Sequence, residues 1–161
     1  MQKITPFLWF DGHAGAAAKF YTSIFRPSKI ESVTPMSATF RLNGMKFIAL
    51  NGGLQFNFTE AISFFVSCPT QKEIDYFWEK LSAGGKQSRC GWLKDKFGVS
   101  WQIVPPILGE LLNDKNEEKS QRVMQAMLQM GKLDIKKLKQ AYQAGNKSKG
   151  IIKPKRKRRT V

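Results

Sequence analysis

The sequence predicts an α+β fold in which two βαβββ modules form a cupped mixed β-sheet with flanking helices, followed by C-terminal helices. Two observations support this prediction. The order strand, helix and three strands occurs twice, and the last strands of the two copies align in phase, with Gly44 opposite Gly98 and Phe47 opposite Trp101. At 161 residues, the chain is long enough to bury the core of one domain or of two small modules joined together.

The first module is expected over residues 3–53, approximately. Its predicted elements are a strand over 4–10, a helix over 13–25 and strands over 28–34, 37–43 and 45–50. The helix is predicted because apolar residues recur at the three–four spacing of one helical face; they are Ala17, Phe20, Tyr21, Ile24 and Phe25. Asp11 and Gly12 break the chain before that helix, and Asn43-Gly44 between the last two strands is a strong hairpin signal.

The second module is expected over residues 58–106, approximately. Its predicted elements are a strand over 61–67, a helix that begins after Thr70, and strands over 86–90, 91–95 and 98–104. Thr70 with Glu73 three residues later is the pattern of a capping box, and Gly84-Gly85 ends the helix. Pro105 and Pro106 end the last strand, since proline donates no hydrogen bond to a strand ladder.

The paired modules therefore occupy residues 1–106, and two further segments follow. Residues 107–145 are predicted to form a helical extension, in which Asp134 caps a helix and Met124, Met127, Leu128 and Met130 form an apolar stripe. This stripe suits either a cover over the protein's own cup or a dimer contact. Residues 146–161 read as a disordered basic tail, because glycine, proline and like charges bury too little apolar area to offset ordering.

The net charge of +15 is concentrated in that tail. Eight of the 27 basic residues follow Asn146 with no acid among them, which leaves 19 basic against 12 acidic residues in the rest of the chain. We expect the tail to attract polyanions weakly and in a salt-dependent way. A solvated terminus without a partner is an equally simple interpretation of the same pattern.

Several classes of protein are excluded by composition. No stretch reaches the roughly 18 apolar residues that a bilayer span needs, and the start MQKITPFLWFDG lacks the pattern of a signal peptide, so no membrane association and a cytoplasmic location are expected. Cys68 and Cys90 match no zinc-ligand spacing and are expected to be free thiols.

The phase of the last strand places one polar residue on a predicted concave surface, the cup. Val99, Trp101 and Ile103 should pack on a helix, which leaves Gln102 facing the cup. The residues predicted to line the cup are Leu8, Phe10, Ile48, Leu50, Ser63, Phe65, Ser100 and Gln102. Such an aromatic surface with a few polar groups suits a small, largely apolar molecule, although Gln102 also suits a core position where its amide bonds the backbone.

Six segments spread from about Ile4 to Tyr142 carry a family resemblance: ITPFLWFDG, KFYTSIF, FIALNGG, EAISFFVSC, CGWLKDKFGVSWQIVP and VMQAMLQMGKLDIKKLKQAY. Together they resemble the PhnB-like branch of the glyoxalase, bleomycin resistance and dioxygenase superfamily, also called the vicinal oxygen chelate superfamily. That branch is often labelled 3-demethylubiquinone-9 3-methyltransferase. The sequence itself shows no glycine-rich nucleotide loop after a strand, as a doubly wound methyltransferase would.

The resemblance implies where a metal would be held, because superfamily enzymes use His, Glu or Gln side chains from the first and last strands of each module. The corresponding places here offer Thr5 or Pro6, Ile48, Ser63 and Gln102. Only Gln102 is a plausible donor, and one neutral amide cannot hold a divalent ion against water. We therefore expect no metal and no other cofactor.

Three functions follow as hypotheses. The leading one is a small-molecule-binding protein of glyoxalase-like fold without a catalytic metal, whose catalytic residues, if any, the sequence does not identify. The second is a metal-dependent lyase, isomerase or dioxygenase in which Gln102, Glu60 and His13 converge. The third is nucleic-acid association through the basic tail. By analogy with the superfamily, we expect a homodimer.

Overall fold

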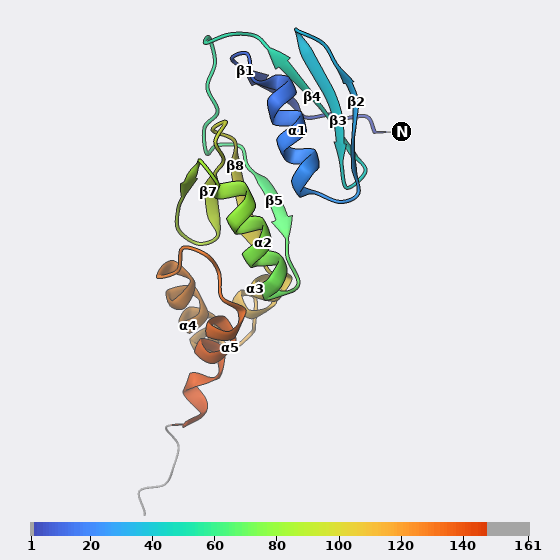
Figure 1. Cartoon of the computed structure of the whole chain (residues 1–161). Coiled ribbons are helices and arrows are strands. Elements are labelled where there is room, and N and C mark those ends of the chain that lie inside the picture. The colour runs from blue at the N-terminus through green and yellow to red at the C-terminus, as the bar shows by residue number, and fades with distance from the viewer. Residues whose placement is uncertain (1, 148–161) are drawn as a thin grey trace, which may run out of the picture.

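The computed structural model describes residues 2–147 and confirms the predicted fold class of two βαβββ modules with C-terminal helices (Figure 1). The first module contains β1 (Phe7–Phe10), α1 (Ala14–Ile24), β2 (Ser28–Val33), β3 (Ser37–Leu42) and β4 (Met45–Asn51). The second contains β5 (Phe64–Ser67), α2 (Gln71–Ser82), β6 (Lys86–Gln87), β7 (Trp92–Lys94) and β8 (Ser100–Val104). The extension contains α3 (Pro106–Leu112), α4 (Glu117–Leu128), α5 (Ile135–Gln143) and the short 3₁₀ helix η1 (Ala144–Lys147).

The strands form two four-stranded mixed sheets with the same topology, ordered β1-β4-β3-β2 and β5-β8-β7-β6. In each sheet the first strand is parallel to the last, and the other pairs are antiparallel. β4 and β8 therefore occupy equivalent positions, as the phase of the two copies predicts. The hydrogen-bonded ladders remain separate, so the cupped sheet of the prediction consists of two sheets rather than one continuous sheet.

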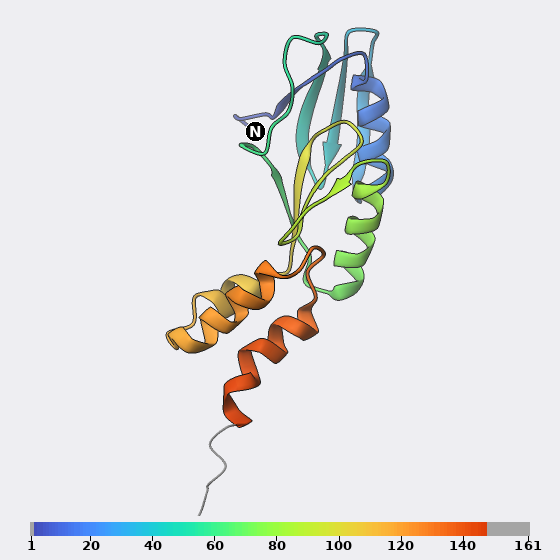
Figure 2. The same ribbon diagram turned by 90° about the vertical axis from the view of Figure 1, so that its left-hand side faces the viewer.

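Both α1 and α2 lie on the same side of the strands, which Figure 2 shows in blue and green. One face of each sheet is thus covered by a helix, and we call the other face the open face. In the second sheet Trp101 and Ile103 are buried in the same core as Ile74, Trp78 and Leu81 of α2, as predicted. Gln102, between them in sequence, lies on the open face.

The first strand differs from the prediction. Leu8 pairs with Ala49 and is buried with it in the core under α1, and Phe10 lies on the same face. Phe7 pairs with Ile48 on the open face. Leu8 and Phe10 were expected to share a surface with Ile48, but the run Pro-Phe-Leu-Trp-Phe is apolar throughout and gives no alternation from which to choose a face.

Local signals explain most element boundaries. Thr70 and Glu73 form the predicted capping box, with the Glu73 backbone N–H donating to Thr70 Oγ1 at 3.2 Å and the Thr70 N–H to Glu73 Oε2 at 3.0 Å. Asn43 and Gly44 both have positive φ, as the tight turn between β3 and β4 requires. The strand predicted over 61–67 begins only at Phe64, and the strand predicted over 86–90 is reduced to Lys86–Gln87.

The C-terminal helices lie beyond the second module and have their own apolar core (Figure 1). This core comprises Val104, Leu108, Leu111, Val123, Leu133 and Leu138. Asp134 caps α5 as predicted, accepting a hydrogen bond from the Lys137 N–H at 3.0 Å. Residues 148–161 of the predicted basic tail lie outside the described residues. Across residues 2–147, no helix is both long and apolar enough to cross a membrane.

Candidate ligand-binding site

The open face of the second sheet carries two cross-strand rows of side chains. In the first row, Gln102 on β8 pairs with Phe65 on β5 and with Trp92 on β7. In the second row, Ser100 on β8 pairs with Lys94 on β7, and Lys94 pairs with Lys86 on β6. Paired residues in neighbouring strands point to the same face, so aromatic, amide, hydroxyl and ammonium groups lie side by side.

Gln102 contacts a second residue of the predicted site. Its Nε2 donates a hydrogen bond to Ser63 Oγ at 2.8 Å, and both side chains are half-buried. Ser63 immediately precedes β5, in which Phe65 is 60% exposed. The structure therefore brings Gln102, Ser63 and Phe65 together at the edge of the second sheet.

Ser100 lies deepest in the predicted site and has an unusual environment. Its side chain is only 1% exposed, and its Oγ is the one buried side-chain oxygen or nitrogen without a hydrogen-bond partner among the described residues. A buried hydroxyl without a partner costs free energy, since it has lost water and gained nothing. Ser100 lines two cavities, of about 440 Å³ and about 390 Å³.

The remaining predicted residues are distributed between the two modules. Ile48 and Leu50 are half-buried on the open face of the first sheet, and no strand pairing or hydrogen bond joins them to Gln102 within the described residues. Leu8 lines the cavity of about 390 Å³ together with Ser100, although it is mostly buried under α1. Phe10 is a core residue that packs edge-on against Phe58, with ring centroids 5.2 Å apart.

The cavity of about 440 Å³ is strongly basic, which the sequence did not indicate. Its lining residues are Glu60, Lys86, Ser88, Arg89, Cys90, Trp92, Leu93, Lys94 and Ser100. Lys94 Nζ forms an ion pair with Glu60 Oε1 at 2.8 Å, and this contact is the main reason that the pKa of Glu60 lies below its ordinary value. Lys86 and Arg89 have no ion-pair partner within the described residues.

Asp95 is the main residue whose role sequence reasoning missed. Its Oδ2 accepts hydrogen bonds from Tyr21 Oη of α1 and Trp101 Nε1 of β8, both at 2.8 Å. Its Oδ1 accepts from the backbone N–H groups of Phe97 and Val99. Burial nevertheless holds the pKa of Asp95 above its ordinary value. The carboxylate joins the two modules from inside the core, while the sequence signals only a hairpin turn there.

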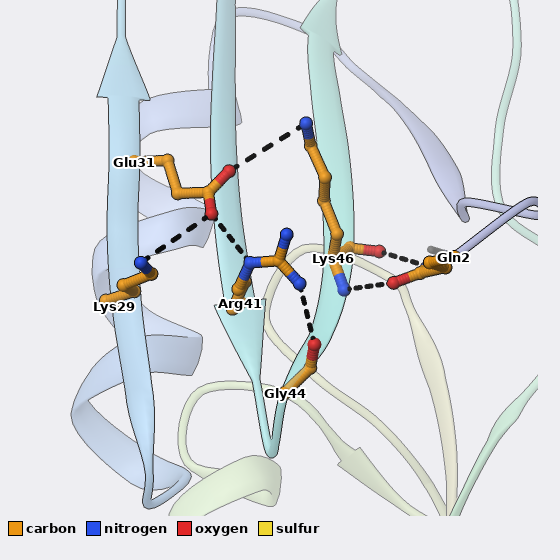
Figure 3. A network of polar contacts seen from close by, with 6 residues as sticks. All are labelled: Gln2, Lys29, Glu31, Arg41, Gly44 and Lys46. Atoms are coloured by element: carbon orange, nitrogen blue, oxygen red, sulfur yellow. Dashed lines mark hydrogen bonds and ion pairs between the residues drawn. The ribbon is translucent and has the colours of Figure 1, made fainter.

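The open face of the first sheet carries a different charged group (Figure 3). Glu31 on β2 accepts a hydrogen bond from Arg41 Nε at 2.6 Å, and Lys46 Nζ and Lys29 Nζ lie 3.8 and 3.9 Å from its carboxylate oxygens. Gln2 also exchanges two hydrogen bonds with the backbone of Lys46. Lys29, Arg41 and Lys46 thus all have Glu31 as their ion-pair partner.

The residues present do not fit a divalent metal. Gln102 bonds Ser63, Glu60 pairs with Lys94, and His13 is the N-cap residue of α1, with its ring centroid 6.0 Å from that of Phe97. The three donors required by the metal hypothesis thus contact three different partners. Residues 2–147 also contain no group of three or more His, Cys, Asp or Glu side chains that could hold an ion.

Comparison with known proteins agrees with the fold. The chain matches the family model described as 3-demethylubiquinone-9 3-methyltransferase over residues 2–104. A solved structure from Bacillus cereus, described as a putative 3-demethylubiquinone-9 3-methyltransferase, PhnB protein, is 39% identical. The match covers 65% of this chain and 99% of that chain, with a TM-score of 0.60.

A more distant structure shares only the fold. It is a protein from Pseudomonas aeruginosa that is 18% identical, with a TM-score of 0.54 and coverage of 65% of this chain and 98% of that chain. No curated protein matches the chain. The family match spans both modules and ends at the last residue of β8, so the chain belongs to the PhnB-like family described as 3-demethylubiquinone-9 3-methyltransferase.

Proposed function

We propose that this PhnB-like protein binds a small molecule on the open face of its second sheet, without a catalytic metal. The observation that carries the proposal is the buried Ser100 hydroxyl, which has no partner within the described residues and lines a cavity beside Trp92 and Lys94. Binding sites of this kind combine apolar walls with a few directed polar groups. Trp92 supplies an apolar wall of that cavity, and Gln102, its partner in the β7–β8 ladder, supplies a directed amide beside it.

Gln102 is the residue that we assign to orienting the ligand. Its amide donates to Ser63, and its carbonyl oxygen accepts no hydrogen bond within the described residues. Because the side chain is only half-buried, that oxygen is accessible to a bound molecule. The Gln102→Leu variant nearly conserves volume and should leave the fold intact while it weakens ligand binding.

Native mass spectrometry of protein taken directly from cells tests the proposal, because it reports small molecule, metal and oligomeric state together. We expect an added mass of a small organic molecule in the wild type and its loss in Gln102→Leu, with equal melting temperatures. A stoichiometric divalent metal in the wild type would contradict the proposal. A decrease of about 1 to 3 kcal/mol in the stability of Gln102→Leu would assign the amide to structure instead.

The proposed assembly is a homodimer in which a second copy covers apolar residues of the N-terminal segment, the linker between the modules and β5. These exposed residues are Ile4, Phe7, Leu54, Phe56, Ile62 and Phe65. The outer edges of β1 and β5 are also unpaired within the described residues. Apolar surface beside an unpaired strand edge is typical of an interface.

The two linker residues Leu54 and Phe56 allow a direct test of this assembly. The Leu54→Glu/Phe56→Glu variant should change the mass measured by light scattering from that of a dimer to that of a monomer. A monomeric wild type would contradict the dimer and leave the binding site to be tested separately.

A further inference from the structure

We infer that the ligand of the second sheet is a small organic acid whose carboxylate lies at the basic end of the cavity and whose apolar part lies on Trp92. This inference rests on the proposed function and specifies the class of molecule bound. It comes from the cations that line the same cavity as the buried hydroxyl, which the binding of a small molecule does not by itself explain.

Two lysines of the cavity are placed side by side. Lys86 and Lys94 are directly opposite each other in the β6–β7 ladder, and their side chains point to the same face. Like charges in this position repel each other and destabilise a strand pair. Glu60 neutralises Lys94 at 2.8 Å, but Lys86 has no ion-pair partner within the described residues. Arg89 lines the same cavity and also lacks one there, so the cavity has an excess of two positive charges.

The Ser100 hydroxyl lies next to these lysines in the same cross-strand row. Ser100 pairs with Lys94 on the neighbouring strand, lines the cavity and is 1% exposed with an unpartnered Oγ. Its O–H can donate to a carboxylate, whereas the adjacent cations have no acceptor capacity of their own. A carboxylate oxygen would thus provide the partner that Ser100, Lys86 and Arg89 lack among residues 2–147.

One wall of the cavity is held in place by backbone hydrogen bonds. The Cys90 N–H donates to the Met130 carbonyl and the Gly91 N–H to the Gly131 carbonyl, both at 2.8 Å. Gly91 has a φ of +82°, and a side chain there would approach the Ile103 carbonyl to 2.7 Å. The loop between β6 and β7 is therefore fixed by the segment between α4 and α5, which holds the backbone that carries Arg89 and Trp92.

Calorimetric titration of the full chain with benzoate tests the inference, with benzamide and inorganic phosphate as matched probes. Benzamide has the ring of benzoate without its negative charge, and phosphate has a negative charge without the ring. We expect benzoate to bind at millimolar concentrations or below, with an affinity that falls as salt is added, and at least about tenfold more tightly than either probe.

Three variants localise the interaction. Lys86→Gln should weaken benzoate binding roughly three- to fivefold, and Lys80→Gln, an exposed lysine on α2 outside the cavity, should not change it. Ser100→Ala should weaken binding roughly three- to tenfold while leaving the protein as stable as the wild type or more so, because it removes an unpartnered buried hydroxyl.

Each outcome distinguishes this inference from the proposed function. Equal affinities for benzoate and benzamide would overturn the inference that the ligand is an acid and would leave the proposal of small-molecule binding intact. Preferential binding of phosphate would show that the cavity binds inorganic oxyanions, and it would overturn the inference that the ligand is an organic acid. Failure of all three probes to bind, together with no small molecule in native mass spectra, would overturn both. A Ser100→Ala variant that binds benzoate like the wild type would remove Ser100 from the site.

Discussion

The two sheets have the same topology, but their open faces present positive charge in different ways. In the first sheet, Lys29, Arg41 and Lys46 all have Glu31 as their partner (Figure 3). In the second sheet, the only acid at the cavity, Glu60, pairs with Lys94 and leaves two cations unmatched within the described residues. Charge alone therefore does not identify a site in this protein.

The second difference is what lies under the charges. The first sheet has strands of six and seven residues at β2, β3 and β4, and its cation group lies across these longer strands, with one register shift in the β2–β3 ladder between Ile30 and Ser32. In the second sheet, β6 and β7 have only two and three residues, and a cavity opens beside them. Shortening of the outer strands in one of two related modules thus accompanies an open cavity.

The largest expected effect is a difference in stability between substitutions on the two faces of the second sheet. Trp101 is 3% exposed and packs against Phe25 and Phe64, so Trp101→Ala should cost about 3 to 5 kcal/mol in the free energy of unfolding. Trp92→Ala, on the open face, should cost clearly less and should abolish benzoate binding. Urea unfolding of both variants is the measurement. A loss under about 1 kcal/mol for Trp101→Ala would mean that the face assignment is inverted.

A somewhat smaller loss of stability is expected for Asp95, whose carboxylate joins the two modules. Asp95→Ala leaves four donors without their acceptor, among them Tyr21 Oη and Trp101 Nε1. Each orphaned donor costs about 1 to 3 kcal/mol and the terms are not additive, so a total loss of roughly 3 kcal/mol is expected. The control is Asp75→Ala, which removes an exposed ion pair to Lys132 and a hydrogen bond from Gln71 and should change stability little. Equal losses of unfolding free energy in Asp95→Ala and Asp75→Ala would show that Asp95 does not join the modules.

The smallest expected effect is an opposite pH dependence in the two modules. The bond from Arg41 holds the pKa of Glu31 below its ordinary value, so its stabilisation is present above the unfolded pKa and is lost as the pH falls through the folded pKa. Burial holds the pKa of Asp95 above its ordinary value, so its contribution is complete below the unfolded pKa and is lost as the pH rises through the folded pKa.

Unfolding free energies of the wild type, Glu31→Gln and Asp95→Ala measured from acidic to neutral pH check these signs. On acidification, the difference between wild type and Glu31→Gln should shrink, and the difference between wild type and Asp95→Ala should grow. Two differences that change in the same direction would show that one of the assigned causes is wrong.

The parts of the fold that sequence could predict are those with a clear period or turn signal. Val99, Trp101 and Ile103 alternate with polar residues, so the face of β8 and the position of Gln102 follow from the pattern. The Asn43-Gly44 turn and the Thr70 cap are equally local. Parts that depend on pairing between distant strands could not be predicted in this way.

The cation row is the clearest example of a feature beyond local signals. Lys86 and Lys94 are eight positions apart, and only the register of the short β6–β7 ladder places them opposite each other. The prediction of a strand over 86–90 contains no information on that register. The contacts of Asp95 likewise depend on the packing of α1 against β8, since Tyr21 lies 74 positions away in sequence.

The central claim is that the second sheet, and not the first, provides the binding surface. The four tryptophans offer a direct test by NMR of the indole N–H signals during a benzoate titration, with each signal assigned by a Trp→Phe variant. Trp92 lines the cavity, Trp78 and Trp101 are buried, and Trp9 of the first module donates to the Gly53 carbonyl. We expect the largest shift at Trp92; the largest shift at Trp9 would show that the first sheet provides the binding surface instead.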